Sequence, residues 1–218
     1  MSVCKLQERK RGLRMTPTIV EGLDLPESPA TVLIADDELL VAQGIMTVLQ
    51  SIGYEVLGPY KNGKEAVQAC KETPPDIALL DIQMPAMDGM KAAHVIFHEL
   101  NIPVVMLTAY SDDTYLKNSH AAGVFGFLLK PASKEQLCAG LSIAWQRFID
   151  HMTQRSQIID LKERLEDRKL IEKAKWIIVQ RKKVSEPNAM KMLQKQSRNS
   201  RKSLASVARA VIDSDGLL

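Results

Sequence analysis

Features that would place this chain in a membrane or in an oxidising compartment are missing. No apolar run approaches the roughly 18 residues that a membrane-spanning helix needs. The N-terminal stretch MSVCKLQERKRGLRM has no apolar segment behind its basic residues, which argues against a secretory signal. Cys4, Cys70 and Cys138 are far apart and form no C-x-x-C pair, so neither disulfides nor zinc are expected. We therefore expect a cytoplasmic protein without a membrane segment.

The 218 residues have the composition of a globular protein, but their charge is unevenly distributed. Apolar residues make up 45% and charged residues 25%, which argues against wholesale disorder. Residues 1–150 hold 13 basic and 18 acidic residues, whereas residues 151–218 hold 16 basic and 8 acidic ones. An acidic part is thus followed by a basic part. This asymmetry favours a polyanionic partner for the C-terminal part.

Apolar, strand-like runs alternate with amphipathic segments from Thr31 to about residue 150. Residues 1–30 show no periodicity, end in the turn-rich DLPESPA, and are predicted to form a flexible leader. Five pairs of strand and helix follow; the helix of the fourth pair is expected over residues 112–123 and that of the fifth over residues 133–150. This order predicts an α/β domain over residues 31–150, with a doubly wound parallel sheet and right-handed crossovers.

Only helical patterns follow residue 150. Residues 151–167 are predicted to form a helical linker, and residues 168–213 a small three-helix domain. In the linker, apolar residues at spacings of three and four form a candidate coiled-coil seam: Ile158, Leu161 and Leu165. In the small domain, Ser185 is suited to cap the second helix, and Pro187 fits its first turn, where a missing N–H group costs little.

Charged and polar residues stand at the ends of four predicted strands: Asp36 and Asp37, Asp81, Thr108, and Lys130. Because the carboxyl ends of parallel strands meet at one edge, these side chains are expected to converge there. Three carboxylates without His or Cys suit Mg²⁺ better than zinc. A hydroxyl and an ammonium group beside them would bind the anionic oxygens of a phosphoryl group. The set predicts phosphoryl transfer with a carboxylate as the attacking group.

The motifs IADDE, ALLDIQMPAMDGM, VVMLTAY and GFLLKP resemble, in order and spacing, the receiver domain of two-component response regulators. The resemblance covers about residues 31–150 and implies a flavodoxin-like, five-stranded sheet of order 2-1-3-4-5. It implies that Asp81 accepts phosphate from a sensor histidine kinase. It also implies that Mg²⁺ is bound by Asp36, Asp37, Asp81 and the carbonyl of Gln83. Thr108 and Lys130 would bind the phosphoryl oxygens. Thr108 and Phe127 would be the residues that change conformation on phosphorylation.

Such a receiver catalyses only its own phosphorylation and dephosphorylation, so no enzyme acting on a metabolite is expected. The alternative is a degenerate receiver that binds partners without phosphate. Other titratable residues fall on predicted turns or helices away from this edge, where surface or core-filling roles suit them better: Asp88, His94, His98, His120 and His151.

Residues 168–212 resemble the ANTAR domain, a three-helix RNA-binding output module of transcription antitermination regulators. The residues that carry the resemblance are Ala174, Lys175, Ala189, Leu193, Ser197, Asn199, Leu204, Val207 and Ala208. The resemblance implies binding to RNA hairpins. Candidate RNA contacts are Lys175, Lys191, Lys195, Arg198, Arg201 and Lys202. The sequence departs from the family at Trp176, Lys183 and Met190; Trp176 either stacks on an unpaired base or serves as a core or partner contact.

Two other outputs remain possible on the sequence. A DNA-binding helix-turn-helix needs a tight turn that often contains Gly, and residues 168–212 contain none. The second alternative output is a coiled-coil helix that docks a protein partner. For signalling, we expect phosphorylation to shift a monomer toward a homodimer through the seam of Ile158, Leu161 and Leu165, because two small modules on neighbouring RNA sites gain avidity.

Overall fold

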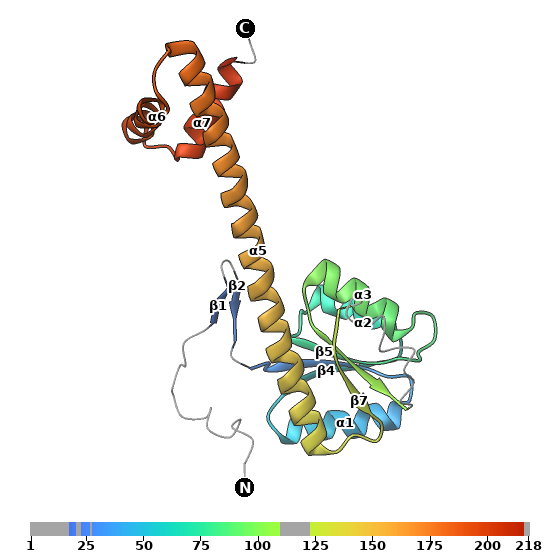
Figure 1. Cartoon of the computed structure of the whole chain (residues 1–218). Coiled ribbons are helices and arrows are strands. Elements are labelled where there is room, and N and C mark those ends of the chain that lie inside the picture. Colours follow the sequence, from blue (N-terminus) through green and yellow to red (C-terminus); the bar gives the residue numbers. More distant parts are fainter. Residues whose placement is uncertain (1–17, 21–22, 27, 110–122, 216–218) are drawn as a thin grey trace. The chain divides into compact units, whose positions relative to one another are not determined.

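The computed structural model describes residues 18–20, 23–26, 28–109 and 123–215 (Figure 1). The chain divides into two compact units, Met1–Thr153 and Gln154–Leu218. The helix predicted over residues 112–123 lies outside the described residues apart from Gly123, and so does His120. Among the residues that are described, none of the helices is both long and apolar enough to span a membrane.

A five-stranded parallel sheet forms the centre of the first unit. Its strands are β3 (Thr31–Ala35), β4 (Glu55–Tyr60), β5 (Ile77–Asp81), β6 (Val104–Thr108) and β7 (Val124–Leu129). Their spatial order is β4-β3-β5-β6-β7, and all neighbouring pairs are parallel. Counted from β3, this is the predicted order 2-1-3-4-5, so the α/β fold class is confirmed.

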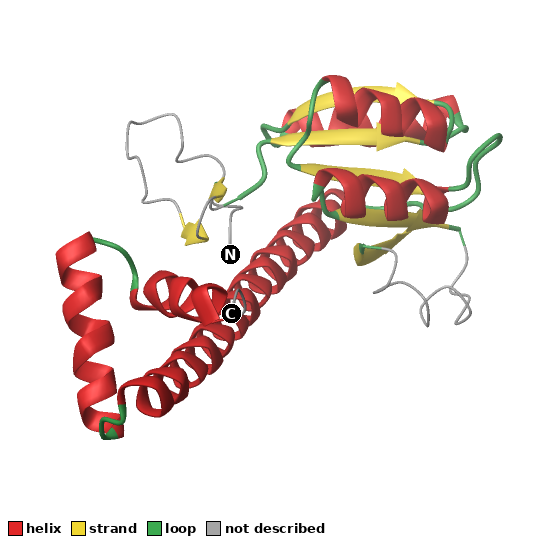
Figure 2. Cartoon of the chain, turned by 90° about the horizontal axis from the view of Figure 1, so that it is seen from above, coloured by secondary structure: helices red, strands yellow, loops and turns green. Residues whose placement is uncertain are grey.

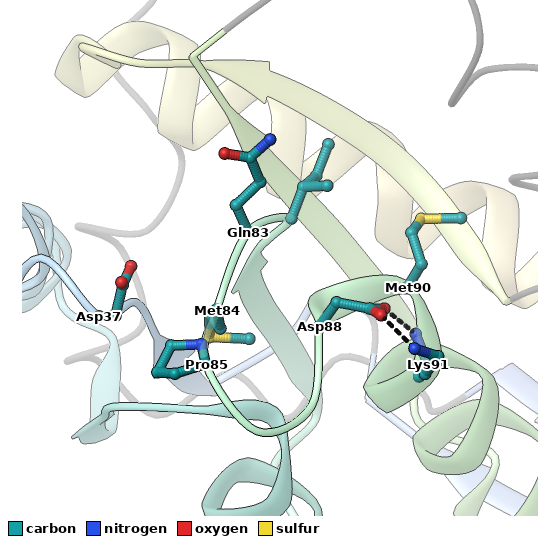
Figure 3. A pocket seen from close by; sticks show the side chains of 8 residues that line it. Asp37, Gln83, Met84, Pro85, Asp88, Met90 and Lys91 are labelled. Carbon is teal, nitrogen blue, oxygen red and sulfur yellow. Dashed lines mark hydrogen bonds and ion pairs between the residues drawn. The ribbon is translucent and has the colours of Figure 1, made fainter.

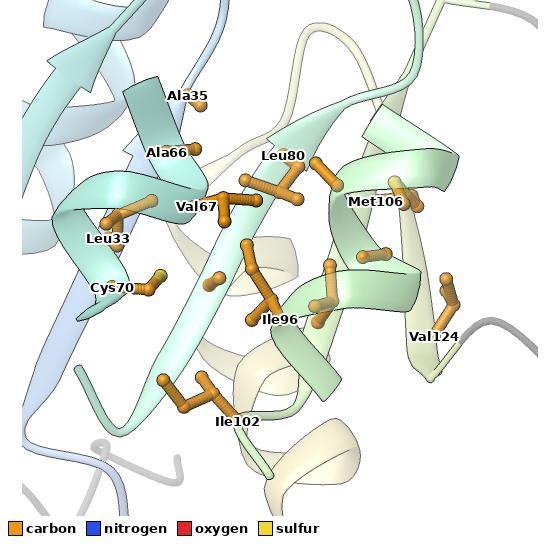
Figure 4. Packing of buried hydrophobic residues seen from close by; sticks show 14 of the residues in the cluster. Leu33, Ala35, Ala66, Val67, Cys70, Leu80, Ile96, Ile102, Met106 and Val124 are labelled. Carbon is orange, nitrogen blue, oxygen red and sulfur yellow. The ribbon is translucent and has the colours of Figure 1, made fainter. Parts of the chain in front are cut away.

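Helices cover both faces of this sheet (Figure 2). One face carries α2 (Gly63–Glu72) and α3 (Gly89–Leu100), and the other carries α1 (Leu39–Ser51) and the first part of α5 (Lys134–Lys182). The strand residues alternate between the two cores, as a pleated strand requires. Leu80 and Met106 face α2 and α3 (Figure 4), whereas Leu79 and Leu107 face α1 and α5.

The described end of the predicted leader over residues 1–30 contains two short strands. Strands β1 (Thr18–Val20) and β2 (Leu23–Leu25) pair in antiparallel fashion. The carbonyl of Pro26 accepts a hydrogen bond of 3.0 Å from the Trp145 indole, and the backbone amide of Ala30 donates to the Asp76 carboxylate at 2.7 Å. Strands of three residues are too short to show periodicity, and both hydrogen-bond partners are distant in the sequence.

The second unit contains the rest of α5, α6 (Glu186–Ser200) and α7 (Leu204–Asp215). Its core consists of small and branched side chains: Ala174, Ile178, Ala189, Leu193, Val207 and Ala208. Ser185 stands at the N-cap position of α6, as predicted, although its side chain makes no capping hydrogen bond, and Pro187 lies in the first turn. The helix expected over residues 133–150, the linker and the first helix of the small domain are one continuous helix, because no Pro or Gly interrupts residues 141–182.

Candidate functional sites

Three carboxylates meet at the carboxyl edge of the sheet. Asp81 is the last residue of β5, and Asp36 and Asp37 follow β3 directly. One carboxylate oxygen from each lies within 4.8 Å of the others. Asp36 and Asp81 are only 1% and 8% exposed, whereas Asp37 is exposed. The convergence expected from the sequence is therefore present for Asp36, Asp37 and Asp81, and two of these acids are removed from water.

The backbone around Asp81 is held closely. The Ile82 amide donates to Oδ1 of Asp81 at 2.9 Å, and the Gly89 amide donates to the Ile82 carbonyl at 2.9 Å. A Cβ atom at Gly89 would clash with the Asp81 carbonyl oxygen, so only glycine fits at the start of α3. The loop after β5 thus returns beside the acid, which explains the glycine in QMPAMDG.

Lys130 enters this cluster from the end of β7. Its Nζ lies 2.6 Å from Oδ2 of Asp36 and 3.3 Å from Oδ1 of Asp81. Glu38 is the third partner, with Oε1 at 3.8 Å. Glu38 was not predicted from the sequence as part of this site, although it directly follows Asp36 and Asp37 in the motif IADDE. A single ammonium group therefore contacts both buried carboxylates.

Burial and charge act against each other in this cluster. Burial raises the pKa of Asp81, and the neighbouring Asp36 adds to the rise, although Lys130 opposes both. Burial acts to lower the pKa of Lys130, but the carboxylates of Asp36 and Asp81 outweigh it, so the pKa is raised. Lys130 is thus held in its charged form, while the ionised form of Asp81 is disfavoured.

Thr108 lies on β6, which pairs with β5, and Phe127 lies on β7, which pairs with β6. Thr108 ends β6, and its carbonyl accepts a hydrogen bond of 2.8 Å from the Lys130 amide. Phe127 lies in β7 opposite Met106 and packs, half-buried, against the core under α2 and α3. A backbone hydrogen bond thus joins the end of β6 to the residue that follows β7.

A pocket of about 680 Å³ opens beside the acids (Figure 3). Its lining includes Asp37, Gln83, Met84, Asp88 and Lys91. The expectation that Asp88 lies away from this edge is wrong, because the loop after β5 brings it back to the pocket. There it caps α3 by accepting a hydrogen bond of 2.8 Å from the Lys91 amide, and it forms an ion pair with the Lys91 ammonium at 2.8 Å.

The described histidines do not belong to the acidic cluster. His94 and His98 lie on α3 with ring centroids 4.3 Å apart. His151 on α5 lies 5.6 Å from the ring of Phe97.

The acidic cluster offers carboxylate oxygen ligands, of the type and number that Mg²⁺ binds. The residues fit this ion.

A basic stripe runs along α6. Lys191, Lys195 and Arg198 are spaced by four and three residues, so they share one face of the helix, and all three are exposed. This face is opposite to Leu193, which lies in the core. Arg201 and Lys202 follow in the turn to α7, where the Ser197 carbonyl accepts a hydrogen bond from the Lys202 amide at 3.2 Å. Five candidate RNA contacts therefore lie on α6 or directly after it.

Lys175 differs from these five residues. Its Nζ lies 2.8 Å from Glu172 and 3.5 Å from Glu186, and its side chain is only 15% exposed. The lysine links α5 to the start of α6, which favours a structural role over contact with RNA. Trp176, by contrast, is 64% exposed, so it is not a core residue of the unit.

The fold and the acidic edge define the class of the protein as a receiver with a helical output, and the comparisons agree. Residues 32–142 match the response regulator receiver domain, and residues 160–212 match the ANTAR domain. The chain belongs to the response regulators, with an N-terminal receiver domain and a C-terminal ANTAR domain. Both resemblances noted in the sequence are confirmed, and the helix-turn-helix and protein-docking alternatives gain no support.

One relative spans nearly the whole chain. The transcriptional regulatory protein PdtaR of Mycobacterium tuberculosis (strain ATCC 25618 / H37Rv) is 34% identical over 188 residues, which cover 86% of this chain and 92% of PdtaR. The match includes the receiver domain and the output domain together.

Solved structures show the same fold for the receiver. A CheY-like response regulator receiver domain protein from Methanospirillum hungatei JF-1 has a TM-score of 0.52 at 22% identity, over 57% of this chain and 99% of that one. A two-component response regulator of the LuxR family from Aurantimonas sp. SI85-9A1 has a TM-score of 0.51 at 19% identity, over 60% and 99%. At these identities the likeness concerns the fold alone.

The charge balance predicts opposite effects for two similar substitutions. Asp36→Asn removes the anion closest to Lys130 and should destabilise the receiver by about 3 kcal/mol, as breaking a buried ion pair does. Asp81→Asn should stabilise it at neutral pH. Since the pKa of Asp81 is higher in the folded than in the unfolded chain, ionisation favours unfolding as pH rises above the ordinary Asp value of about 3.9.

Urea unfolding without Mg²⁺ checks this prediction, with fluorescence of the buried Trp145 as the signal in a Trp176→Phe background. The gain from Asp81→Asn should be small near pH 4 and larger at neutral pH. Shifts of the same sign for both variants at neutral pH would contradict this charge balance.

Proposed function

We propose that Asp81 is the phosphoacceptor of this response regulator and that its phosphorylation by a sensor histidine kinase controls RNA binding by the ANTAR domain. The observation that carries the proposal is the contact of Lys130 with both Asp36 and Asp81 at the carboxyl edge of the sheet. An oxygen of the Asp81 carboxylate forms the new bond to phosphorus, while the bond from phosphorus to the histidine nitrogen of the kinase breaks.

The other residues of the edge have complementary roles in this proposal. Asp36, Asp37 and Asp81, with the carbonyl of Gln83, would hold Mg²⁺, which neutralises charge on the phosphoryl oxygens when bound. Lys130 binds one phosphoryl oxygen with its ammonium group, and the Thr108 hydroxyl binds another. Phe127 is proposed to change rotamer as Thr108 moves. In this scheme the protein is a cytoplasmic regulator, and its chemistry is limited to its own phosphorylation and dephosphorylation.

The output is proposed to be binding to RNA hairpins, and thereby transcription antitermination. The support is the match to the ANTAR domain together with the basic stripe of Lys191, Lys195 and Arg198 on α6. Cations on one helix face can follow a phosphate backbone, which supplies most of the affinity for a nucleic acid. Trp176 is exposed and could add stacking on a base, as aromatic side chains do on single-stranded RNA.

Asp81→Asn should abolish phosphorylation by a small phosphodonor, because the amide keeps the shape of the carboxylate but cannot attack phosphorus. Intact-mass measurement after donor treatment detects the adduct. Asp88→Asn is the matched control, since Asp88 lines the pocket but pairs with Lys91, and it should still be phosphorylated. Removal of Mg²⁺ should reproduce the effect on the native chain. A persistent adduct on the Asp81 variant would refute the assignment.

Charge reversal of Lys191, Lys195, Arg198, Arg201 and Lys202 should weaken RNA binding without altering phosphorylation. The test RNA is a hairpin that the native chain selects from a pool with a randomised loop. Its affinity is measured at several salt concentrations, and the salt slope should fall by about 0.7 to 0.9 for each RNA phosphate that the variant no longer neutralises. Reversal of Lys64 and Lys134, two exposed lysines of the receiver unit, is the control. Equal slopes for both variants would place the RNA surface elsewhere.

The seam on α5 is proposed to form a homodimer when Asp81 is phosphorylated. Ile158, Leu161 and Leu165 are 52%, 58% and 58% exposed, although their spacing puts them on one face. Leu161→Lys with Leu165→Lys should prevent a rise in mass after phosphorylation, as measured by light scattering. Leu40→Lys, at an apolar residue 84% exposed on α1, should leave that rise intact. A native chain whose mass and RNA affinity do not respond to phosphorylation would exclude this route.

A further inference from the structure

A second pocket lies within the three-helix unit and is separate from the basic stripe. It has a volume of about 310 Å³ and is bounded by residues of α5, α6 and α7. Its walls are mostly apolar and include Ile177, Met192, Val207 and Val211. Ile177 and Val207 are each 6% exposed, and Met192 is 37% exposed. The pocket therefore combines buried apolar side chains with one partly exposed thioether, a side chain that adapts its shape readily.

The charged side chains that line this pocket are all basic. Arg181 and Lys182 belong to its lining, and no carboxylate does. Lys195, of the basic stripe, follows Met192 by three residues and so lies on the adjoining part of α6. An occupant with an apolar body and a negative charge beside it is favoured by this arrangement. The basic excess of residues 151–218, with 16 basic against 8 acidic residues, points the same way.

Two uncharged polar side chains complete the lining. Gln196 offers an amide, which both donates and accepts hydrogen bonds. The Ser214 hydroxyl donates to the Val211 carbonyl at 2.8 Å, so its oxygen is left to act as an acceptor. An unstacked nucleobase fits these groups: its faces are apolar, its edge is polar, and phosphates flank it on the strand. Proteins read single-stranded RNA by holding bases in this way.

We propose that this pocket takes one unstacked nucleobase of the bound RNA, while Arg181 and Lys182 bind the phosphates beside it. A volume near the lower end of the roughly 300–1,000 Å³ found for small-molecule sites suits a single base. The proposal rests on the proposed RNA-binding function and adds a sequence-reading element to it. The stripe on α6 supplies affinity for any strand, whereas the pocket distinguishes a loop with a suitably placed base from a continuous duplex.

The experiment uses the full chain and the hairpin selected from the randomised-loop pool. Each loop nucleotide in turn is replaced by an abasic ribose, and the affinity of the native chain is measured. One position should lose about tenfold or more in affinity, the effect expected when a stacked base is removed. Ser214→Trp fills the pocket, so it should bind the intact hairpin about tenfold more weakly and lose its sensitivity to the abasic change at that position.

Ser206→Trp is the matched control, because Ser206 is also an exposed serine of α7 but does not line the pocket. It should keep the native affinity and the native response to the abasic change. Gln196→Trp fills the same pocket from α6 and should repeat the result of Ser214→Trp, which keeps the test informative if one variant fails to fold. Helix content by circular dichroism establishes folding.

Four outcomes would overturn the proposal. If both filled variants keep the native affinity and abasic profile, the pocket holds no base. If they change only the oligomeric state, the pocket belongs to a contact between copies of the chain. If the native chain selects no hairpin at all, the RNA function fails and the pocket assignment with it, whereas hairpin binding that is insensitive to every abasic change overturns the pocket alone.

Discussion

The acidic site at the carboxyl edge of the receiver sheet depends on the ion pairs that the ammonium group of Lys130 forms with Asp36 and Asp81. Asp36 and Asp81 are both buried, and two carboxylates at such close range would repel each other in a medium of low dielectric constant. Lys130 contacts both, at 2.6 and 3.3 Å. Its backbone amide also donates a hydrogen bond to the carbonyl of Thr108. The residue that balances the two carboxylates therefore also joins the ends of β6 and β7. A phosphoryl group added to Asp81 would alter that balance at its centre.

Helix α5 contributes side chains to two separate hydrophobic cores. Leu137 and Leu141 belong to the core between the sheet, α1 and α5, and Ala174 and Ile178 belong to the three-helix core. The segment between them contains no Gly or Pro and presents the apolar residues of the seam to solvent. An apolar stripe of this kind is favourable only when another surface covers it. This is why the proposed dimer is placed on α5.

Much of the fold and part of the site could be predicted from local patterns. Alternating strand and helix signals were sufficient for the parallel sheet, since crossovers between parallel strands are restricted to one hand. The acids Asp36, Asp37 and Asp81 could be placed together because strand ends share one edge. The continuity of helix α5 was harder to predict from the sequence. It depends on the absence of Gly and Pro, and no residue pattern marks it directly. The three-residue strands β1 and β2 left no periodic signal.

The sequence by itself determined which residues end the strands, which helix faces are apolar, and that the basic charge lies in the C-terminal part. The tertiary structure decided what each charge meets. Asp88 returns to the pocket because Gly89 allows the loop to pass against the Asp81 carbonyl. Lys175 meets Glu186, in addition to its helix neighbour Glu172, because α6 begins beside it. The pocket bounded by α5, α6 and α7 also exists only in three dimensions. Contacts between residues far apart in the chain leave no periodic trace, so spacing cannot predict them.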